Sequence, residues 1–351
     1  MSESSLEIEK YKLKEKDKID IGHTSSITQI SMIPSKNYVS VSFDKSIIIF
    51  DENSKVIQKI ENAHEKEITY VSIKDEDNFA TCGNDKSIKF WKKEGNEFKF
   101  NKQISNAHEK GIHKILFDSN GNLYSSSADY SVKIWKLTND NDYINEATLR
   151  HEDEVYSFLV IEDKNLLISS GVGEDKTIFW DLNSYNKISE IDNITSYTSN
   201  SMMRINDNIV VIGEEDGRKL RFVDISQKKL VKEIKNKFYV FGLYLMKEKG
   251  VFLVGGGYGI AVYRIDNYKR LQNSKYDNDI SGFFPMKDEV IGTFGDNGKI
   301  QTWKFELKNE NDKEEKSESS DNDENDENDN NNKDDNDDND DNDVIDDNDD
   351  N

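Results

Sequence analysis

A repeat with a period of about 40 to 45 residues constrains the fold of this chain more than any other feature of its sequence. Segments 60–92 and 104–136 share Ala-His-Glu-Lys, an alternating apolar run, a turn, a second run, an Asp with a Ser two positions later, and a terminal Trp. Further copies of this skeleton precede and follow them. The copies begin at His23, His64, His108 and His151, with weaker copies near Thr195, Asn236 and Tyr276.

Short strands fill each copy. In the first copy, segments 27–33, 38–43 and 46–51 carry the period-2 apolar pattern of β-strands, and a fourth run, 55–61, follows them. No segment shows the 3.6-residue apolar stripe of an amphipathic helix. Four short strands in a period of about 40–45 residues are the signature of a propeller blade. The sequence therefore predicts an all-β, seven-bladed β-propeller with almost no helix.

Recurrent residues mark corresponding positions of the copies. The dipeptides that open four copies are Gly22-His23, Ala63-His64, Ala107-His108 and Arg150-His151. A turn Asp occurs at Asp44, Asp85, Asp129, Asp175, Asp216 and Asp296. The third strands end at Phe50-Asp51, Trp91-Lys92, Trp135-Lys136, Trp180-Asp181, Val223-Asp224 and Trp303-Lys304. With these motifs, residues 8–308 resemble the WD-repeat β-propeller family, as seven copies of which four are strong and three degenerate.

The resemblance implies how the ring closes. In that family the sequence repeat is offset from the structural blade, and the last copy here ends with its third strand, 298–306. Residues 8–20 precede the first His and are the expected source of the missing outer strand. We therefore expect a propeller domain over residues 1–308 that is closed by an N-terminal strand.

By the same resemblance, a His, a Ser or Thr, an Asp and a Trp of one copy are expected to hydrogen-bond in series and stiffen the blade. The expected sets are His64–Thr81–Asp85–Trp91, His108–Ser125–Asp129–Trp135, and His23–Ser40–Asp44 ending at Phe50. The fourth set contains His151, Asp175 and Trp180, with either Ser169 or Ser170 as the hydroxyl.

The four repeat histidines could suggest a metal site, but their spacing argues against one. Each lies in a different copy, whereas metal ligands must converge within about 2.0–2.1 Å of one ion. The Gly-rich segment 255–259 lacks the following Lys-Ser/Thr and helix of a phosphate loop. Cys82 lies within a strand and is interpreted as a small buried residue. We therefore expect no metal, no cofactor and no catalytic residue, and hence no enzyme.

Partner binding is expected on the face that carries the loops before the innermost strands, which is the face the family most often uses. The residue after the first strand Ile or Val and the residue before the turn Asp both point there. The candidates are Thr28, Phe43, Thr69, Asn84, His113 and Tyr156. A residue at any one of these positions is more often merely solvated, although the large apolar side chain of Phe43 is unusual in that role.

Residues 309–351 have a different composition. They hold 22 acidic residues and three lysines, a net charge of −19, and a single apolar pair, Val344 and Ile345. Such a segment cannot bury enough apolar surface to offset the entropy of ordering it. We expect a disordered acidic tail rich in Asp and Asn. It could be a solubilising appendage or a means of attracting basic proteins.

Composition excludes several other classes of protein. One cysteine in 351 residues excludes an internal disulfide framework and a Cys-based zinc site. No apolar run reaches the roughly 18–20 residues of a membrane helix, and the N-terminus has no apolar signal segment. A formal charge of −23 opposes direct binding of nucleic acid. These features predict an intracellular protein, cytoplasmic or nuclear, that does not insert into a membrane.

The resemblance and the lack of a catalytic constellation favour a non-catalytic scaffold. Such a protein would bind peptide segments or subunits of a multiprotein complex on the loop face of the propeller. The alternative is an acidic-tailed chaperone or assembly factor for a basic client, such as a ribosomal protein or a histone. This alternative rests on analogy with acidic-tailed members of the family.

Overall fold

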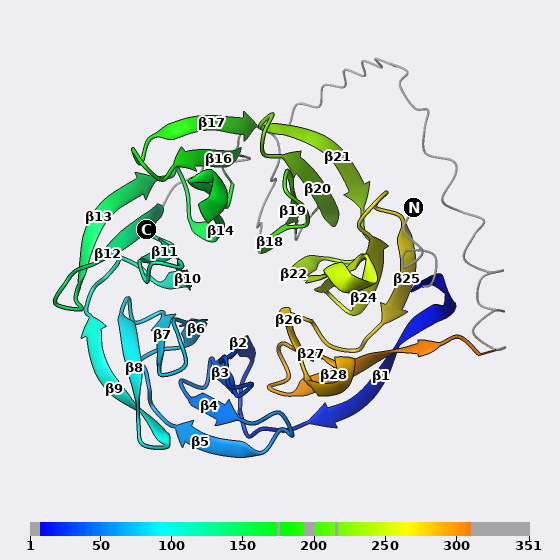
Figure 1. The fold of residues 1–351 in the computed structure, drawn as a ribbon, viewed down its shortest axis with the longest axis horizontal. Coiled ribbons are helices and arrows are strands. Elements are labelled where there is room, and N and C mark those ends of the chain that lie inside the picture. Colours follow the sequence, from blue (N-terminus) through cyan, green and yellow to red (C-terminus); the bar gives the residue numbers. More distant parts are fainter. Residues whose placement is uncertain (1–7, 174–175, 193–200, 215–216, 310–351) are drawn as a thin grey trace, which may run out of the picture. The chain divides into compact units, whose positions relative to one another are not determined.

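The computed structural model describes residues 8–173, 176–192, 201–214 and 217–309. Within these residues the chain forms seven four-stranded antiparallel sheets arranged as blades around a central axis (Figure 1). The prediction of an all-β, seven-bladed propeller is confirmed. The tail beyond Asn309, which was predicted to be disordered, lies outside the described residues, as do Asp175 and Asp216.

Six blades consist of four consecutive strands, written from the innermost to the outermost. Blade 1 is β2 (Ile27–Met32), β3 (Tyr38–Ser42), β4 (Ile47–Phe50) and β5 (Val56–Ile60); blade 2 is β6 (Ile68–Ile73), β7 (Asn78–Gly83), β8 (Ile88–Glu94) and β9 (Glu97–Ile104); blade 3 is β10 (Ile112–Phe117), β11 (Leu123–Ser127), β12 (Ser131–Leu137) and β13 (Tyr143–Arg150). Blade 4 is β14 (Val155–Ile161), β15 (Leu166–Gly171), β16 (Lys176–Asp181) and β17 (Lys187–Asp192); blade 5 is β18 (Ser201–Arg204), β19 (Ile209–Gly213), β20 (Lys219–Asp224) and β21 (Lys229–Lys235); blade 6 is β22 (Val240–Met246), β23 (Val251–Gly256), β24 (Gly259–Arg264) and β25 (Arg270–Lys275).

Blade 7 combines both ends of the propeller sequence. Its inner strands are β26 (Gly282–Pro285), β27 (Ile291–Phe294) and β28 (Ile300–Leu307), and its outermost strand is β1 (Tyr11–Ile19). The described helical segments are short 3₁₀ turns: η1 (Ile8–Lys10), η2 (Glu162–Lys164), η3 (Lys247–Lys249) and η4 (Lys287–Glu289). The expectation of almost no helix is confirmed.

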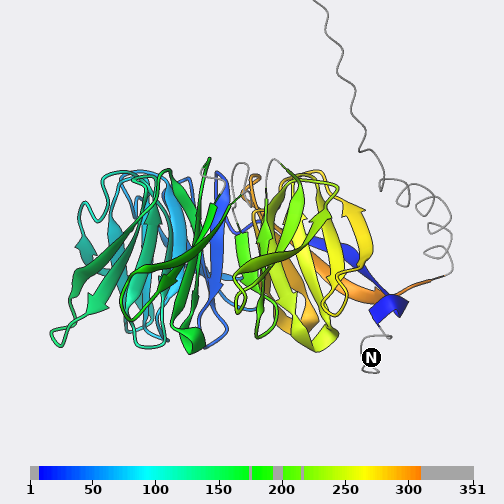
Figure 2. The same ribbon diagram turned by 90° about the horizontal axis from the view of Figure 1, so that it is seen from above.

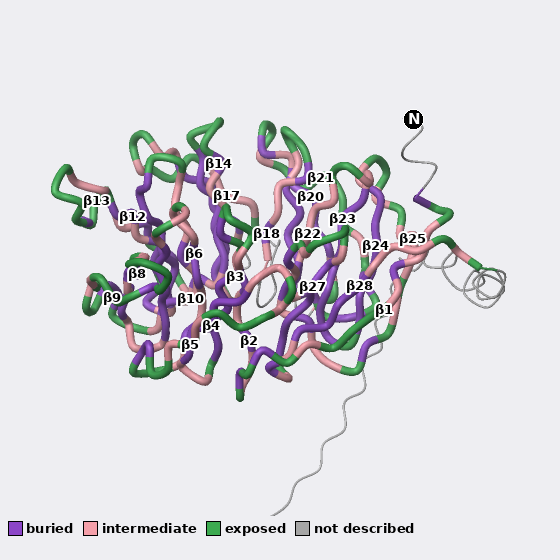
Figure 3. Tube along the Cα trace, turned by 60° about the horizontal axis from the view of Figure 1, so that its bottom comes forward, coloured by how far each residue is buried: buried purple, intermediate pink, exposed green. Residues whose placement is uncertain are grey.

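The strands run between the two faces of the propeller, as the edge-on view shows (Figure 2). Second strands such as β11 and β15 are buried along their whole length, because a neighbouring blade covers each face of the sheet. Outermost strands such as β21 are mostly exposed. Figure 3 shows buried residues following the strands, while exposed residues gather in the loops at the two faces.

The hydrophobic core lies between the blades. One apolar cluster joins Val39 and Ile47 of blade 1 to Val71, Phe79 and Trp91 of blade 2. A separate cluster lies at each of the other blade-to-blade junctions of the described ring. No single sheet could bury these side chains alone, so each blade depends on both neighbours.

The first strand closes the ring. β1 pairs antiparallel with β28, from Tyr11 opposite Leu307 to Ile19 opposite Ile300. Leu13 is 2% exposed and packs in the cluster that contains Trp303. The side-chain amide of Gln272 in β25 also accepts a hydrogen bond from the Leu13 amide and donates one to its carbonyl, both at 2.8 Å. The N-terminal strand therefore fastens blade 7 to blade 6, and the predicted closure is confirmed.

The Gly-rich segment 255–259 is a tight turn. β23 ends at Gly256 and β24 begins at Gly259, so only Gly257 and Tyr258 connect them. A Cβ atom on Gly256 would lie 1.6 Å from the Tyr239 carbonyl oxygen, which explains why this position has no side chain. The turn precedes a strand, so it lacks the helix that a phosphate loop requires.

Closure by β1 predicts a specific stability effect. Leu13→Ala removes a buried side chain from the blade 6–blade 7 junction, and we expect the free energy of unfolding to fall by about 2–5 kcal/mol. Lys18→Ala, on the exposed part of the same strand, should change it by less than about 0.5 kcal/mol. Equilibrium urea unfolding measures both. Equal unfolding midpoints for the two variants would contradict closure through Leu13.

Candidate functional site

In blades 2 and 3 a complete hydrogen-bonded series crosses each sheet. His108 Nδ1 lies 2.8 Å from Asp129 Oδ2, and His108 Nε2 lies 2.7 Å from Ser125 Oγ. Trp135 Nε1 donates to the same Ser125 oxygen at 2.8 Å. A carboxylate only accepts, so His108 carries its proton on Nδ1 and its Nε2 accepts from the serine hydroxyl. His64, Thr81, Asp85 and Trp91 repeat this arrangement in blade 2.

Blades 1 and 4 contain shorter described versions. In blade 1, His23 bonds Asp44 at 3.0 Å and Ser40 at 2.9 Å, and Phe50 occupies the Trp position without an N–H to donate. In blade 4, Ser169 bonds both His151 Nε2 and Trp180 Nε1 at 2.8 Å. Ser170 instead bonds Thr177, so Ser169 is the hydroxyl of this set. Asp175 lies outside the described residues.

A further serine belongs to the networks of blades 1, 2 and 3. The hydroxyls of Ser46, Ser87 and Ser131 donate to the Asp two residues earlier, at 2.6, 2.7 and 2.5 Å. They were missed as network members, although the Asp followed two positions later by Ser is visible in the repeat. This spacing is informative because the hydroxyl of a Ser two residues after an Asp commonly bonds to the Asp carboxylate within a local turn.

The degenerate blades replace the network in different ways. In blade 6 the Tyr263 hydroxyl donates to Asn236 Oδ1 at 2.9 Å, so one direct bond joins the positions that the Trp and the His occupy in the strong blades. In blade 5 the hydroxyl position is Ile212 and the Trp position is Val223, and both pack in an apolar cluster. Neither substitution could be derived from the repeat motif.

Blade 7 retains part of the network and corrects one assignment. Trp303 Nε1 donates to Thr293 Oγ1 at 3.0 Å, as in the strong blades. The expected turn Asp was Asp296, but Asn297 occupies the position of Asp85, and its side chain accepts from the Lys299 amide at 2.9 Å. Asp296 lies one residue earlier in the turn, at the position equivalent to Asn84. It accepts a hydrogen bond from the Ser26 hydroxyl, and both residues line the central cavity described below.

Burial and hydrogen bonding shift the titration of these groups. Burial lowers the pKa of His23, His64 and His108, against the opposing effect of their Asp partners. Burial acts to raise the pKa of Asp44, but hydrogen bonds from Ser46 and Thr24 lower it to about 2. The histidines are therefore neutral and Asp44 is ionised near neutral pH, which suits a structural network.

The partner-binding candidates on the inner strands share a backbone irregularity. The register of β2, β6, β10, β14 and β22 against the second strand shifts after its first residue, which is a β-bulge. The bulged residues are Thr28, Thr69, His113, Tyr156 and Phe241. A bulge re-aims its side chain, and all five line one cavity at the centre of the propeller. Sequence reasoning missed Phe241, because blade 6 lacks the His from which the position is counted.

The central cavity has a volume of about 610 Å³ and receives residues from all seven described blades. Phe43 lies on its wall and leaves 42% of its surface exposed. His113 stacks on Tyr156, with ring centroids 3.9 Å apart. Burial lowers the pKa of His113 to about 4, and its Nε2 lies 3.8 Å from Glu154 Oε2. The lining of the cavity includes Ser26 and Asp279, which lie in loops before the inner strands.

Two of the candidates, Thr28 and Thr69, also link neighbouring blades. Thr28 Oγ1 donates to the Ile68 carbonyl of blade 2 at 2.9 Å, and Thr69 Oγ1 donates to the Ile112 carbonyl of blade 3. Asn84 Nδ2 donates to Glu67 Oε2 at 3.2 Å. The structure thus brings Thr28, Phe43, Thr69, His113 and Tyr156 to one cavity, whereas Asn84 lies in a turn beside it.

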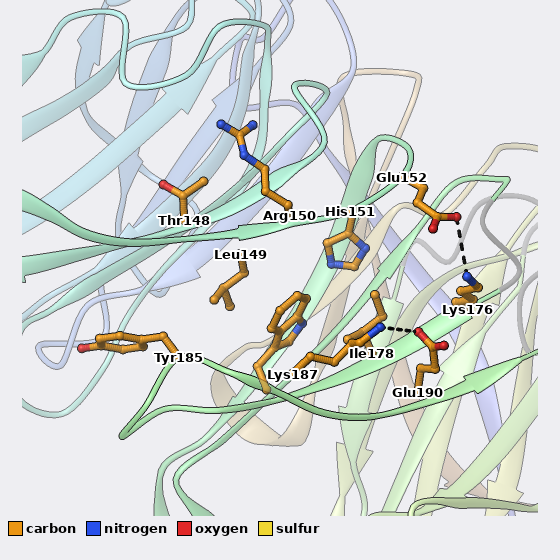
Figure 4. A pocket seen from close by; sticks show the side chains of 11 residues that line it. Thr148, Leu149, Arg150, His151, Glu152, Lys176, Ile178, Tyr185, Lys187 and Glu190 are labelled. Atoms are coloured by element: carbon orange, nitrogen blue, oxygen red, sulfur yellow. Dashed lines mark hydrogen bonds and ion pairs between the residues drawn. The ribbon is translucent and has the colours of Figure 1, made fainter.

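A second pocket of about 350 Å³ lies at the rim between β13 and the outer strands of blade 4 (Figure 4). Its charged groups are largely paired: Lys176 with Glu152 at 3.5 Å and Lys187 with Glu190 at 3.0 Å. Elsewhere, burial raises the pKa of Cys82 to about 12, so this thiol is not a nucleophile near neutral pH.

Among the described residues, no group of three or more His, Cys, Asp or Glu side chains is placed to hold a metal ion. In the same part of the chain, none of the helices has the length and apolar character needed to cross a membrane.

The hydroxyl at the centre of the network should be important for stability. Ser125→Ala leaves the buried ring nitrogens of His108 and Trp135 without their shared partner, and we expect a loss of about 1–3 kcal/mol. Ser126→Ala is the matched control, because Ser126 is buried in the same strand and its hydroxyl has no hydrogen-bond partner. Urea unfolding of both variants makes the comparison. An equal loss in the control would assign the effect to packing.

The same network predicts sensitivity to acid. The pKa of His108 is lowered in the folded chain, so the unfolded chain takes up the proton first, beginning near its ordinary pKa of about 6.5. Stability should be full above that pH and fall as the pH drops below it. The lowered pKa of Asp44 adds a further loss between about pH 4 and 2. Urea midpoints from pH 8 to 4 measure this, and His108→Gln should show a shallower fall. A midpoint that is unchanged between pH 7.5 and 5 would contradict it.

The family comparison agrees with this architecture. The family model described as WD domain, G-beta repeat (WD40) matches residues 15–51, 55–92 and 100–136. The first match runs from β1 to the end of β4, so the sequence repeat is offset from the blade. A comparison with curated proteins found no match. Three matched WD40 repeats, together with seven described blades of one four-stranded pattern, are consistent with a WD-repeat β-propeller.

Proposed function

We propose that this protein is a non-catalytic interaction scaffold that binds peptide segments or complex subunits at the mouth of its central cavity. WD40 propellers generally act as protein-interaction scaffolds and are typically not catalytic. The observation that carries the proposal is the convergence of bulged side chains from five blades on one cavity beside the exposed ring of Phe43. Exposed aromatic side chains beside a concavity are common anchors for protein partners.

Two physical features favour this use of the site. The ring is fixed by apolar clusters between blades and by hydrogen bonds such as Thr69 to Ile112, so the cavity wall needs little reorganisation on binding. The wall also combines apolar groups, such as Phe241 and Phe283, with the carboxylates of Asp279 and Asp296. A mixed lining of this kind fits an extended segment that presents both apolar and polar side chains.

A second candidate function is the assembly or escort of a basic client. The observation that favours it is the net charge of −19 in residues 309–351. A dense acidic segment speeds encounter with cationic proteins and is screened by salt. In both versions we place the protein inside the cell, and the choice between cytoplasm and nucleus does not affect the argument.

The first test asks whether the cavity mouth binds partners. Proteins captured by the full chain from native lysate should be reduced at least about tenfold by Phe43→Ser or Tyr156→Ala, because each removes an aromatic contact. Phe100→Ser is the matched control, since Phe100 is a 53% exposed aromatic residue on the rim strand β9. Quantitative mass spectrometry of the captured proteins provides the readout. Equal losses in all three variants, or none, would contradict binding at the mouth.

The second test separates the two functions. We expect residues 1–308 alone to retain the partners of a scaffold at both low and high salt. The partners of a basic-client chaperone would instead dissociate when the tail is removed, and would dissociate from the full chain at high salt. The same capture assay, run at about 50 and 500 mM salt, measures both. Loss of every partner on tail removal would refute the scaffold proposal.

A further inference from the structure

One lysine in the central cavity has an unusual environment. Lys114, on the inner strand β10 of blade 3, is the only lysine or arginine among the described residues that line the cavity. Its Nζ donates to the Phe158 carbonyl of blade 4 at 2.9 Å. Within the described residues it forms no ion pair with a carboxylate. A half-buried ammonium that is compensated by one carbonyl is poorly solvated relative to a surface lysine.

Aromatic rings form the rest of its surroundings. The Lys114 Nζ lies 5.9 Å from the ring centroid of Tyr70 on β6 and 5.3 Å from that of Phe158 on β14. The neighbouring titratable groups are Tyr70, the neutral imidazole of His113 on the same strand, and Tyr156 on β14. Glu154 contacts His113. Asp279, in the loop before blade 7, and Asp296, in a turn of blade 7, also line the cavity.

The burial of Lys114 raises the fraction of its side chain that is present as the neutral amine. Burial alone lowers its pKa to about 8, with no contribution from a nearby charge. At pH 7 about a tenth of such amines are uncharged, against fewer than about one in a thousand for a lysine of ordinary pKa near 10.4. Neutral amines are the nucleophilic form of lysine, and desolvation in an apolar pocket is a recognised route to lysine reactivity.

We propose that Lys114 is a covalent modification site at which the amine takes small aldehydes from the central cavity as imines. The nitrogen lone pair attacks the carbonyl carbon and the carbonyl oxygen takes a proton, which gives a carbinolamine. Loss of water then forms the C=N bond, so one aldehyde is consumed and one water is released. No oxidant or reductant is needed.

Space for an adduct is present beside Lys114. The residue lines a cavity of about 610 Å³, which is large enough for a small organic aldehyde. An adduct on the amine would lie near the ring of Tyr70, whose centroid is 5.9 Å from Nζ. This inference does not depend on the proposed partner binding, because it concerns the chemistry of the unbound chain.

The test measures the reactivity of every lysine in the unmodified full-length protein. Limiting isotope-labelled formaldehyde with cyanoborohydride, which reduces the imine to a stable amine, labels each lysine at its own rate. Peptide mass spectrometry then reports these rates between pH 6 and 10. We expect Lys114 to react at least about tenfold faster than Lys133 at pH 7. Its rate should reach half its maximum near pH 8.

Lys133 is the internal reference, because its Nζ also donates to a backbone carbonyl, that of Ala107, and lies over an aromatic ring, that of Trp135. Lys133 does not line the cavity, so the comparison isolates the effect of the cavity environment. No substitution is required, and misfolding cannot confuse the result. A Lys114 rate no greater than that of Lys133, or a half-maximum above pH 10, would overturn the proposal.

Discussion

Apolar packing between neighbouring sheets is the interaction on which the rest of this structure depends. Each described junction holds its own cluster, such as the one that joins Val71 and Phe79 of blade 2 to Val39 of blade 1. A sheet with two apolar faces cannot be stable alone, so the blades must form a closed series. The pairing of β1 with β28 is therefore a requirement of the packing, since an open ring would expose Leu13, Trp303 and their neighbours to water.

The buried hydrogen-bond networks add rigidity to this packing, and the blades differ in how they do so. Where the His, hydroxyl, Asp and Trp are present, the outer part of the sheet is fastened to the loop before the inner strand, as His108 is fastened to Asp129. Blade 6 achieves a similar link with Tyr263 and Asn236, whereas blade 5 relies on apolar contacts at Ile212 and Val223. Either a satisfied polar network or an apolar contact is stable at these positions, while a half-satisfied network would be costly. This explains how the repeat motif decays without loss of the blade.

Much of the fold could be predicted from the sequence, because period, strand alternation and turn residues are local signals that seven copies reinforce. The site was less accessible. Counting from the His located Thr28, Thr69, His113 and Tyr156, but Phe241 has no His to count from, and one residue of error put the turn Asp of blade 7 at Asp296 where Asn297 serves. No local pattern reports that Lys114 forms no ion pair with any described carboxylate, since its surroundings arise only when blades 2, 3 and 4 meet.

The bulged residue of the inner strand links neighbouring blades in some blades and presents a ring to the central cavity in others. In blades 1 and 2 a Thr occupies it, and its hydroxyl bonds a carbonyl of the next blade, so the position contributes to holding the ring. In blades 3, 4 and 6 the residue is His, Tyr or Phe, and the ring faces the cavity. A short hydroxyl can reach the adjacent strand, whereas a large ring cannot make that bond and must occupy open space. The cavity wall therefore combines rings from blades 3, 4 and 6 with threonines of blades 1 and 2 that bond to the next blade, so a partner that contacts the rings meets a wall whose blades are linked to one another.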